Sequence, residues 1–386
     1  MSWTMDGDGD RSRRDALKVL GAGVAAAALA GPASAQALFP KGAVIRTLLK
    51  DYTPEELAGG ATLFHEHMSL RDGFLTDWGR YAAESRATNR APNAPAPAAP
   101  AARPAGAEAA APPTTPPPYF MYDVDLMAEE LSIAKKEGIA CLVDGGHPDM
   151  GRDIGFLRKI SEKSGMPIVA GAGFYSQPFY PKELASWSEE QVYQAIMKQV
   201  NADPIGALGE IGSWDYITKD ERKVFRAIGR VQKATNLPVF THTGIPGKSA
   251  LQQLDLLEDA GADLKHVVIG HLGNLVDANT EIQRAIIRRG AFVGFDRQGG
   301  AGDDAVVPMV MSLIEAGYAG NIMFSSDLAS ARELKRNNPA GGYAKTLTTF
   351  VPKVKKAGAS DEVLHQIMVD NPRRFLAFVP KVKRKG

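Results

Sequence analysis

Eight short apolar runs, separated by amphipathic stretches, recur along this chain of 386 residues. This alternation is typical of repeated strand and helix units on a parallel sheet. Stretches such as DLMAEELSIAKKEG and DERKVFRAIGRVQKAT carry apolar residues three and four positions apart, which predicts helices. The apolar runs are ATLFHEH (61–67), IACLVDG (139–145), PIVAGAGFY (167–175), ALGEIG (207–212), PVFTHT (238–243), HVVIGH (266–271), AFVGFD (291–296) and IMFSSD (322–327). Eight such units closing on themselves predict a (β/α)8 TIM barrel.

A doubly wound open sheet is the alternative fold for this order of elements. It would need fewer strands and a glycine-rich phosphate-binding turn after the first strand, and the sequence has no such turn. A chain of 386 residues with 44% hydrophobic content can bury the core of a barrel of about 250 residues or more. We therefore expect one barrel domain over 38–386.

The N-terminal segment has the order of an export signal. Arg13 and Arg14 precede the weakly apolar stretch VLGAGVAAAALAG, and the small residues ASAQA follow. This order is similar to a twin-arginine signal peptide, predicted over 1–37 with cleavage after Ala35 or Ala37. The apolar stretch is too short and too rich in glycine and alanine to span a bilayer. We expect a periplasmic or secreted protein without a stable membrane span.

One segment interrupts the alternation. The 28 residues from 91 to 118 contain 12 alanines and 10 prolines. Proline at this density blocks helix and ladder hydrogen bonds, which predicts a flexible, partly polyproline II insertion at about 71–120. Because the insertion follows the first strand, it emerges on the face where a barrel carries its active site. A lid or a partner tether is one interpretation, and an insertion without function is the other.

Charge and cysteine content exclude several classes of partner and cross-link. The net charge of +1, from 45 Lys and Arg against 44 Asp and Glu, gives no electrostatic reason to expect nucleic acid or an anionic membrane as partner. Cys141 is the only cysteine, so no intramolecular disulfide can form, and its apolar surroundings predict a buried, inert thiol. A small-molecule partner is expected instead.

Six side chains with metal-binding chemistry lie at or near the ends of the apolar runs. The carboxyl ends of barrel strands are where catalytic groups gather. Four imidazoles and two carboxylates suit Zn, Mn, Fe or Co better than Mg or Ca. The residues are His65, His67, Glu210, His242, His271 and Asp327. The set predicts the metal centre of a hydrolase.

Each member of this set also has a structural interpretation. His65 and His67 are two positions apart in a strand, so both face the barrel interior while Glu66 faces the helices. A pair of core histidines without metal would show the same spacing. Lone histidines at strand ends, such as His242 and His271, are also more often structural than ligands. Two of them on consecutive strands, beside the first pair, favour ligands.

The two carboxylates leave similar alternatives. Burying an ionised Glu210 without positive charge would be costly, so a metal ion or a salt bridge to a barrel-lining Arg or Lys must neutralise it. Asp327 directly ends the last apolar run after two serines. It is expected to bind metal through one oxygen and accept a proton with the other, and an N-cap for the following helix is the alternative.

Together these strings carry a family resemblance. They are TLFHEHMSL, GRDIGFLRKISEKSG followed by IVAGAGFY, GEIG, FTHTG, VVIGHLG, GFDRQGG, SSD and DNPRRFLAF. Over nearly all of 42–378 the chain resembles the phosphotriesterase branch of the amidohydrolase superfamily. The resemblance implies a binuclear centre, with two ions that are zinc or else Mn, Co or Fe, and a homodimer. Its ligand assignments put His65, His67 and Asp327 on the buried ion, His242 and His271 on the exposed ion, and Glu210 between the two ions.

The implied mechanism is hydrolysis by a hydroxide held between the two ions. In it Asp327 accepts the proton, and Asp296 passes it outward or orients Arg297. The chain departs from the best-known members at Glu210, where they carry a carboxylated lysine, although a subset has glutamate. It departs again at Arg297, because phosphotriesterases proper tend to have histidine after the aspartate, whereas lactonase-like relatives tend to have arginine.

The expected substrate is therefore a lactone or a carboxylic ester. Two alternatives stay open at this point. One is an aryldialkylphosphatase that acts on phosphotriesters. The other is an exported metal-binding scaffold without turnover.

Overall fold

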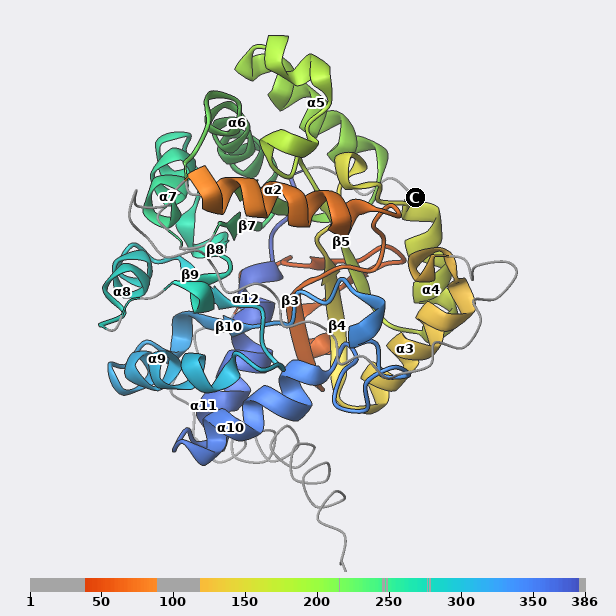
Figure 1. The fold of residues 1–386 in the computed structure, drawn as a ribbon, viewed down its shortest axis with the longest axis vertical. Helices are drawn as coiled ribbons and strands as arrows, with labels where there is room; N and C mark the ends of the chain where they lie inside the picture. The colour runs from red at the N-terminus through yellow and green to blue at the C-terminus, as the bar shows by residue number, and fades with distance from the viewer. Residues whose placement is uncertain are drawn as a thin grey trace, which may run out of the picture.

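A computed structural model describes residues 39–88, 119–214, 216–244, 247, 249–275, 277 and 279–381. Eight parallel strands form one sheet in chain order, from β3 to β10, and helices surround it (Figure 1). The strands are β3 (Ala61–Glu66), β4 (Ile139–Asp144), β5 (Ile168–Ala172), β6 (Ile205–Ser213), β7 (Val239–Thr243), β8 (Val267–Ile269), β9 (Phe292–Phe295) and β10 (Ile322–Phe324). Each of the eight predicted runs thus overlaps one strand, and β6 extends beyond its run at both ends.

The helices follow the strands around the outside of the sheet. They are α2 (Phe74–Thr88), α3 (Val124–Lys136), α4 (Ile154–Ser164), α5 (Glu189–Ala202), α6 (Lys219–Thr235), α7 (Ala250–Asp259), α8 (Glu281–Arg288), α9 (Asp303–Glu315), α10 (Val351–Lys356), α11 (Asp361–His365) and α12 (Asn371–Leu376). α6 shows why the sequence starts and stops a helix where it does. Thr218 and Glu221 form a capping box at its start, and Asn236 ends it in the left-handed conformation.

The first and last strands meet at the carboxyl end of the barrel. The backbone N–H of Asp327 donates to the carbonyl of His65 at 3.1 Å, and that of His67 donates to the carbonyl of Leu328 at 3.1 Å. These bonds join the end of β3 to the segment after β10. The predicted (β/α)8 TIM barrel is therefore confirmed.

Two apolar layers fill the molecule. One lies inside the barrel and includes Phe64, Val143, Phe240 and Phe292, and Phe375 of α12 packs against the rings of Phe64 and Phe292. The other lies between the strands and the surrounding helices. The interior layer also takes in Ile45 of the short antiparallel pair β1 (Ile45–Arg46) and β2 (Asp51–Tyr52). Apolar packing thus fills the barrel below the strand ends.

A β-bulge in β3 decides which side chains face the interior. Leu63 pairs with Leu142 and Glu66 pairs with Asp144, so β3 has one more residue than β4 between these two pairs. As a result Leu63 belongs to the outer layer, whereas Phe64 belongs to the interior layer. Simple alternation would have placed Phe64 opposite His65. The bulge lets one large apolar side chain and the two histidines after it share the interior.

The expectation of a flexible insertion over about 71–120 was wrong for its first part. Residues 74–88 form α2, which crosses the front of the barrel in Figure 1. The sequence FLTDWGRYAAESRAT has no proline and only one glycine, so the helix-breaking composition is confined to 91–118. That segment and the predicted signal peptide at 1–37 lie outside the described residues.

Two further expectations concern single features of the fold. Cys141 is buried and unpaired, and burial raises the pKa of its thiol to about 12, as expected for an inert cysteine. Among the described residues, no helix has both the length and the apolar character that crossing a membrane requires.

Candidate active site

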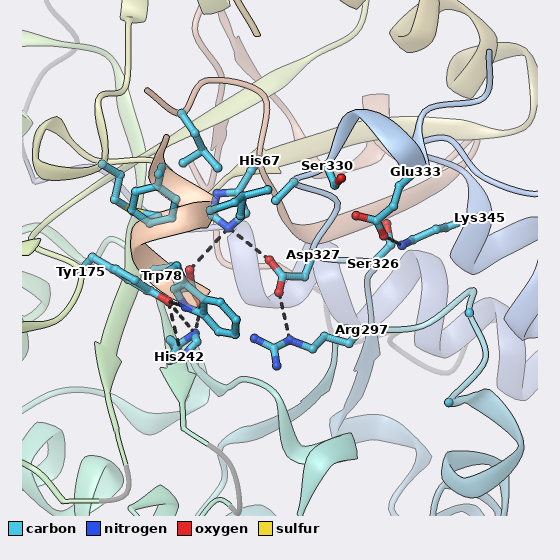
Figure 2. Close-up of a pocket in the computed structure, with 18 of the residues that line it drawn as sticks. His67, Trp78, Tyr175, His242, Arg297, Ser326, Asp327, Ser330, Glu333 and Lys345 are labelled. Atoms are coloured by element: carbon cyan, nitrogen blue, oxygen red, sulfur yellow. Dashed lines mark hydrogen bonds and ion pairs between the residues drawn. The ribbon is translucent and has the colours of Figure 1, made fainter. Parts of the chain in front are cut away.

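The carboxyl ends of five strands bring the six predicted side chains into one cluster, and Figure 2 shows His67, His242 and Asp327 of this cluster. β3 leads into the two histidines, β6 and β7 supply one side chain each, and the segments after β8 and β10 supply the last two. The side chains of His65, Glu210, His242 and His271 are at most 2% exposed. Residues far apart in the sequence thus meet where parallel strands end.

Glu210 lies at the middle of this cluster with one oxygen toward each pair of histidines. Its Oε1 lies 2.7 Å from Nδ1 of His242 and 3.1 Å from Nε2 of His271. Its Oε2 lies 3.4 Å from Nε2 of His65 and 3.5 Å from Nε2 of His67. A carboxylate in this position has the geometry of a bridge between two adjacent cations.

Asp327 completes the group around His65 and His67. Its Oδ1 lies 3.1 Å from Nε2 of His67 and 3.6 Å from Nε2 of His65. Its Oδ2 accepts a hydrogen bond from Nε of Arg297 at 3.1 Å. One oxygen therefore faces the histidines and the other faces the cavity arginine.

The backbone at Asp327 and at His271 is unusual. Both residues have positive φ, 49° and 61°, and among the described residues only Asn236 and Thr280 share this feature without being glycine. Non-glycine residues pay an energetic cost in this region and hold it where the surroundings enforce it, often at functional sites. The positive φ values therefore mark both as positions of functional interest.

Asp296 holds the two histidines that flank it, which differs from the sequence expectation. Its carboxylate lies 2.9 Å from Nδ1 of His65 and 2.9 Å from Nδ1 of His271, and it accepts the backbone N–H of His271 at 2.7 Å. The structure shows no hydrogen bond between Asp296 and Arg297, because Arg297 pairs with Asp327 instead. Asp296 therefore fixes both rings with Nε2 toward the centre.

Glu66 supports the loop that carries Asp327. The backbone N–H groups of Ser326 and Leu328 donate to its carboxylate at 2.8 and 2.9 Å, and the hydroxyls of Ser325 and Ser326 lie 2.8 Å from it. Its side chain does point away from the cluster, as expected, but its partners belong to the segment after β10 rather than to the helices. Burial raises the pKa of this carboxyl group.

The protonation pattern of the cluster reflects its concentration of opposite charges. Burial disfavours the ionised form of Glu210, yet the neighbouring His65 and His242 lower its pKa well below the ordinary value. Burial likewise opposes a charge on His67, and hydrogen bonds to Asp327 and Glu210 outweigh it and raise its pKa to about 9. The pKa of His242 falls to about 4, chiefly because of burial. The carboxylates therefore stay ionised, and positive charge compensates them.

The donor set fits metal ions on observations from the structure itself. Within the described residues, Nε2 of His65 and Nδ1 of His67 are buried without a hydrogen-bond partner. Nδ1 of His242 and Nε2 of His271 face each other at 2.8 Å, both directed at Glu210. Ligand atoms within 4.8 Å of one another form the groups His65–His67–Glu210, Glu210–His242–His271 and His65–His271–Asp296. Converging imidazole and carboxylate atoms of this kind suit divalent transition metals.

A cavity of about 360 Å³ opens onto this cluster. Leu70, Phe74 and Met150 form an apolar part of its wall, and Arg297 and Lys345 bring cationic groups to it. Lys345 pairs with Glu333 on the side of the cavity away from Trp78 (Figure 2). Asp327, the partner of Arg297, and Glu333 also line the cavity, so it combines an apolar wall with paired charges.

Sequence reasoning missed two aromatic residues of the site. Trp78 Nε1–H donates to the hydroxyl of Tyr175 at 2.9 Å, and that hydroxyl lies 3.0 Å from Nδ1 of His242. The guanidinium of Arg297 lies 5.6 Å from the ring centre of Trp78. Tyr175 ends a predicted strand run, which was a usable signal. Trp78 lies in the segment taken for a flexible insertion, so only the helical composition of 74–88 could have revealed it.

The phosphotriesterase family model matches residues 53–376. Curated relatives include the N-acetyltaurine hydrolase of Pongo abelii, 30% identical over 66% of this chain and 78% of that protein, and that of Xenopus tropicalis, 27% identical over 86% and 98%.

Two solved structures are also similar. The Escherichia coli phosphotriesterase homology protein, complexed with phosphate in its active site, has a TM-score of 0.66 and 25% identity, covering 82% of this chain and 98% of that one. A resiniferatoxin-binding protein from Rhodobacter sphaeroides has a TM-score of 0.69 and 29% identity, covering 86% and 94%. The match over most of the chain agrees with the barrel and its candidate metal-binding cluster: this chain belongs to the phosphotriesterase family of hydrolases.

Proposed function

We propose that this protein hydrolyses a carbonyl-centred bond at a binuclear metal site. The observation that carries the proposal is the position of Glu210, with one oxygen toward His65 and His67 and the other toward His242 and His271. In this assignment Asp327 would help His65 and His67 hold one ion, His242 and His271 would hold the other, and Glu210 would serve both. Zinc, manganese, cobalt or iron would suit these donors. When bound, such ions lower the pKa of a water toward neutrality and polarise the bond to be cut.

Asp327 is the proposed general base. Burial opposes its ionisation, but the charge of His65 and the hydrogen bond to His67 outweigh this effect and hold its pKa well below the ordinary value. It is therefore ionised at neutral pH, and it lines the cavity, where its carboxylate can take the proton of an attacking water. Nε of Arg297 donates a hydrogen bond to Oδ2 of Asp327, and the guanidinium of Arg297 lies over the ring of Trp78. Asp296 is a positioning residue that orients the rings of His65 and His271.

The first candidate substrate is an N-acyl amide with an anionic group on its amine part. Two observations support it. The relatives named above are N-acetyltaurine hydrolases, and Arg297 and Lys345 place cations in a cavity that also has an apolar wall. A lactone or carboxylic ester is the second candidate, favoured by Arg297 directly after Asp296, which is similar to lactonase-like members. Both bonds present a planar carbonyl to the same groups.

A substrate panel with metal analysis tests the proposal. The metal-loaded protein is assayed with N-acetyltaurine, a γ-lactone, an aryl carboxylic ester and an aryl phosphotriester. We expect two metal equivalents per chain, hydrolysis of at least one carbonyl substrate, and loss of turnover after chelation with recovery on adding metal back. Preference for the phosphotriester would overturn the carbonyl assignment and favour an aryldialkylphosphatase. Full metal loading without turnover on any substrate would favour a binding scaffold.

A further inference from the structure

A second cavity adjoins the candidate active site. It has a volume of about 580 Å³ and lies between α2, α3 and the segment after β10. Leu75 and Ser330 line both this cavity and the active-site cavity, so the two adjoin at these side chains. Ser330 lies on the side of the active site opposite Tyr175 and Trp78 (Figure 2). We call the second cavity the side groove, lined by Leu75, Tyr119, Phe120, Asp123, Leu126, Ser330, Ala331, Leu334, Arg336 and Asn337.

Apolar side chains dominate the wall of the side groove. Tyr119 and Phe120 pack edge to face with ring centres 4.9 Å apart, and both are half-buried. Leu75 is 38% exposed although it is a large apolar residue. An exposed apolar side chain at the junction of two cavities is expected where an apolar ligand covers it.

Polar groups of the wall are largely engaged within the protein. The carboxylate of Asp123 accepts the backbone N–H groups of Asp125 and Leu126 as the N-cap of α3. The amide of Asn337 donates to the carbonyl of Ala331 at 2.7 Å, and the hydroxyl of Ser330 accepts the backbone N–H of Arg332. Arg336 is exposed. The side groove therefore offers few groups for polar recognition and much surface for apolar contact.

We propose that the side groove receives the acyl chain of the substrate, so that the physiological substrate carries an apolar chain longer than acetyl. The inference rests on the proposed function above, since the scissile carbonyl must lie at the metal site. The acyl part is the end that fits, because the anionic amine part would lose hydration in an apolar groove. Arg297 and Lys345 line the active-site cavity, whereas Arg336, the cation among the residues that line the side groove, is exposed to solvent.

A chain-length series tests the proposal. The metal-loaded protein is assayed with the taurine amides of acetyl, butanoyl, hexanoyl and octanoyl groups. Burial of each added methylene in an apolar site favours binding by about fourfold. We expect kcat/KM to rise with chain length by up to about this factor per methylene, until the chain fills the groove. Calorimetric titration of the same compounds reports binding separately from turnover.

Two variants and one control locate the chain. Leu126→Glu puts a charge into the side groove at the first turn of α3, where an acidic residue suits the helix. Ala331→Phe fills the groove with an apolar ring. Each should lower the ratio of octanoyl to acetyl kcat/KM by about 15-fold, the equivalent of about two methylenes. Leu49→Glu is the control, because Leu49 is 40% exposed and lines neither cavity.

The outcomes distinguish a failure of the proposed acyl-chain site from a failure of the proposed reaction. Hydrolysis of the acetyl compound without any gain from longer chains would refute the side groove and leave the proposed function standing. An octanoyl-to-acetyl ratio of kcat/KM that is unchanged in both groove variants would place the chain elsewhere and also refute it. If no acyl taurine is hydrolysed, the amide assignment fails, and the calorimetric titrations still test the side groove. Affinity that rises with chain length and falls in Leu126→Glu supports the groove as the acyl-chain site. Affinity that does not change with chain length overturns it.

Discussion

Two buried glutamates in neighbouring elements behave in opposite ways. Glu210 of β6 and Glu221 in the first turn of α6 are both almost without solvent contact. Burial works against the ionised form of each. The histidines around Glu210 reverse that effect and lower its pKa well below the ordinary value, whereas Glu221 has backbone N–H partners at Thr218 and Gln177 and its pKa rises to about 7.

The difference shows how a functional carboxylate can be told from a structural one. Asp296 and Asp327 resemble Glu210, since histidines lower their pKa values against the effect of burial. Glu66 and Asp144 resemble Glu221, since burial raises their pKa values while backbone N–H groups bind them. The first group concentrates negative charge that needs a cation, and the second group holds loops and helix ends in place.

Replacing Glu210 should have the largest effect. In Glu210→Ala the two histidine pairs lose the carboxylate that joins them, so we expect metal content to fall and kcat/KM to drop by more than about 100-fold. Glu221→Gln is the matched control, because it alters an equally buried carboxyl group outside the cluster. It should keep both metal and turnover. Metal analysis and the substrate panel measure both variants. A Glu210→Ala protein that keeps its full metal content would show that Glu210 is not needed to hold the ions, and so does not differ from Glu221 in this respect.

Asp296→Asn should have the second largest effect. The amide can accept from one histidine but presents an N–H group to the other, so one of the rings of His65 and His271 loses its orientation. We expect metal affinity to weaken by about 10- to 100-fold. Competition against a chromogenic chelator measures it. Unchanged affinity would show that packing alone orients the rings and would assign Asp296 to another role.

The strand-end histidines were predictable because barrel topology and the alternation of side chains place them without knowledge of distant contacts. The same reasoning could not find the bulge that brings both Phe64 and His65 inward, because a bulge depends on pairing with β4. It also could not pair Arg297 with Asp327, since the preference of a long guanidinium depends on three-dimensional neighbours. Trp78 was not predicted as a site residue because the predicted flexible insertion, based on the proline-rich composition of 91–118, was extended over the helical segment 74–88.

Glu66→Gln should have a smaller effect than either change in the cluster. Glutamine keeps the size of the side chain, but its N–H group must face the backbone donor of either Ser326 or Leu328. The loop that carries Asp327 then shifts slightly, and we expect kcat to fall by roughly 3- to 10-fold while metal content stays the same. Loss of metal in this variant would move Glu66 into the group of Glu210.

Glu221→Gln should have the smallest effect, visible only as a pH dependence of stability. The folded protein keeps a proton on Glu221 up to about pH 7, whereas the unfolded chain releases it near the ordinary pKa of 4.5. The stability contributed by the neutral carboxyl group is therefore complete below about pH 4.5 and is lost as the pH rises through 7. Glutamine cannot ionise and can still accept the Thr218 N–H of the capping box, while the lost acceptor for the Gln177 N–H lowers stability equally at every pH. The Tm of the variant relative to the wild type should thus rise by roughly 2 to 4 °C between pH 5 and pH 8, measured by circular dichroism at constant metal. A Tm difference independent of pH would mean that Glu221 is ionised in the folded protein and that backbone donors alone can sustain a buried carboxylate, which would remove the contrast with Glu210.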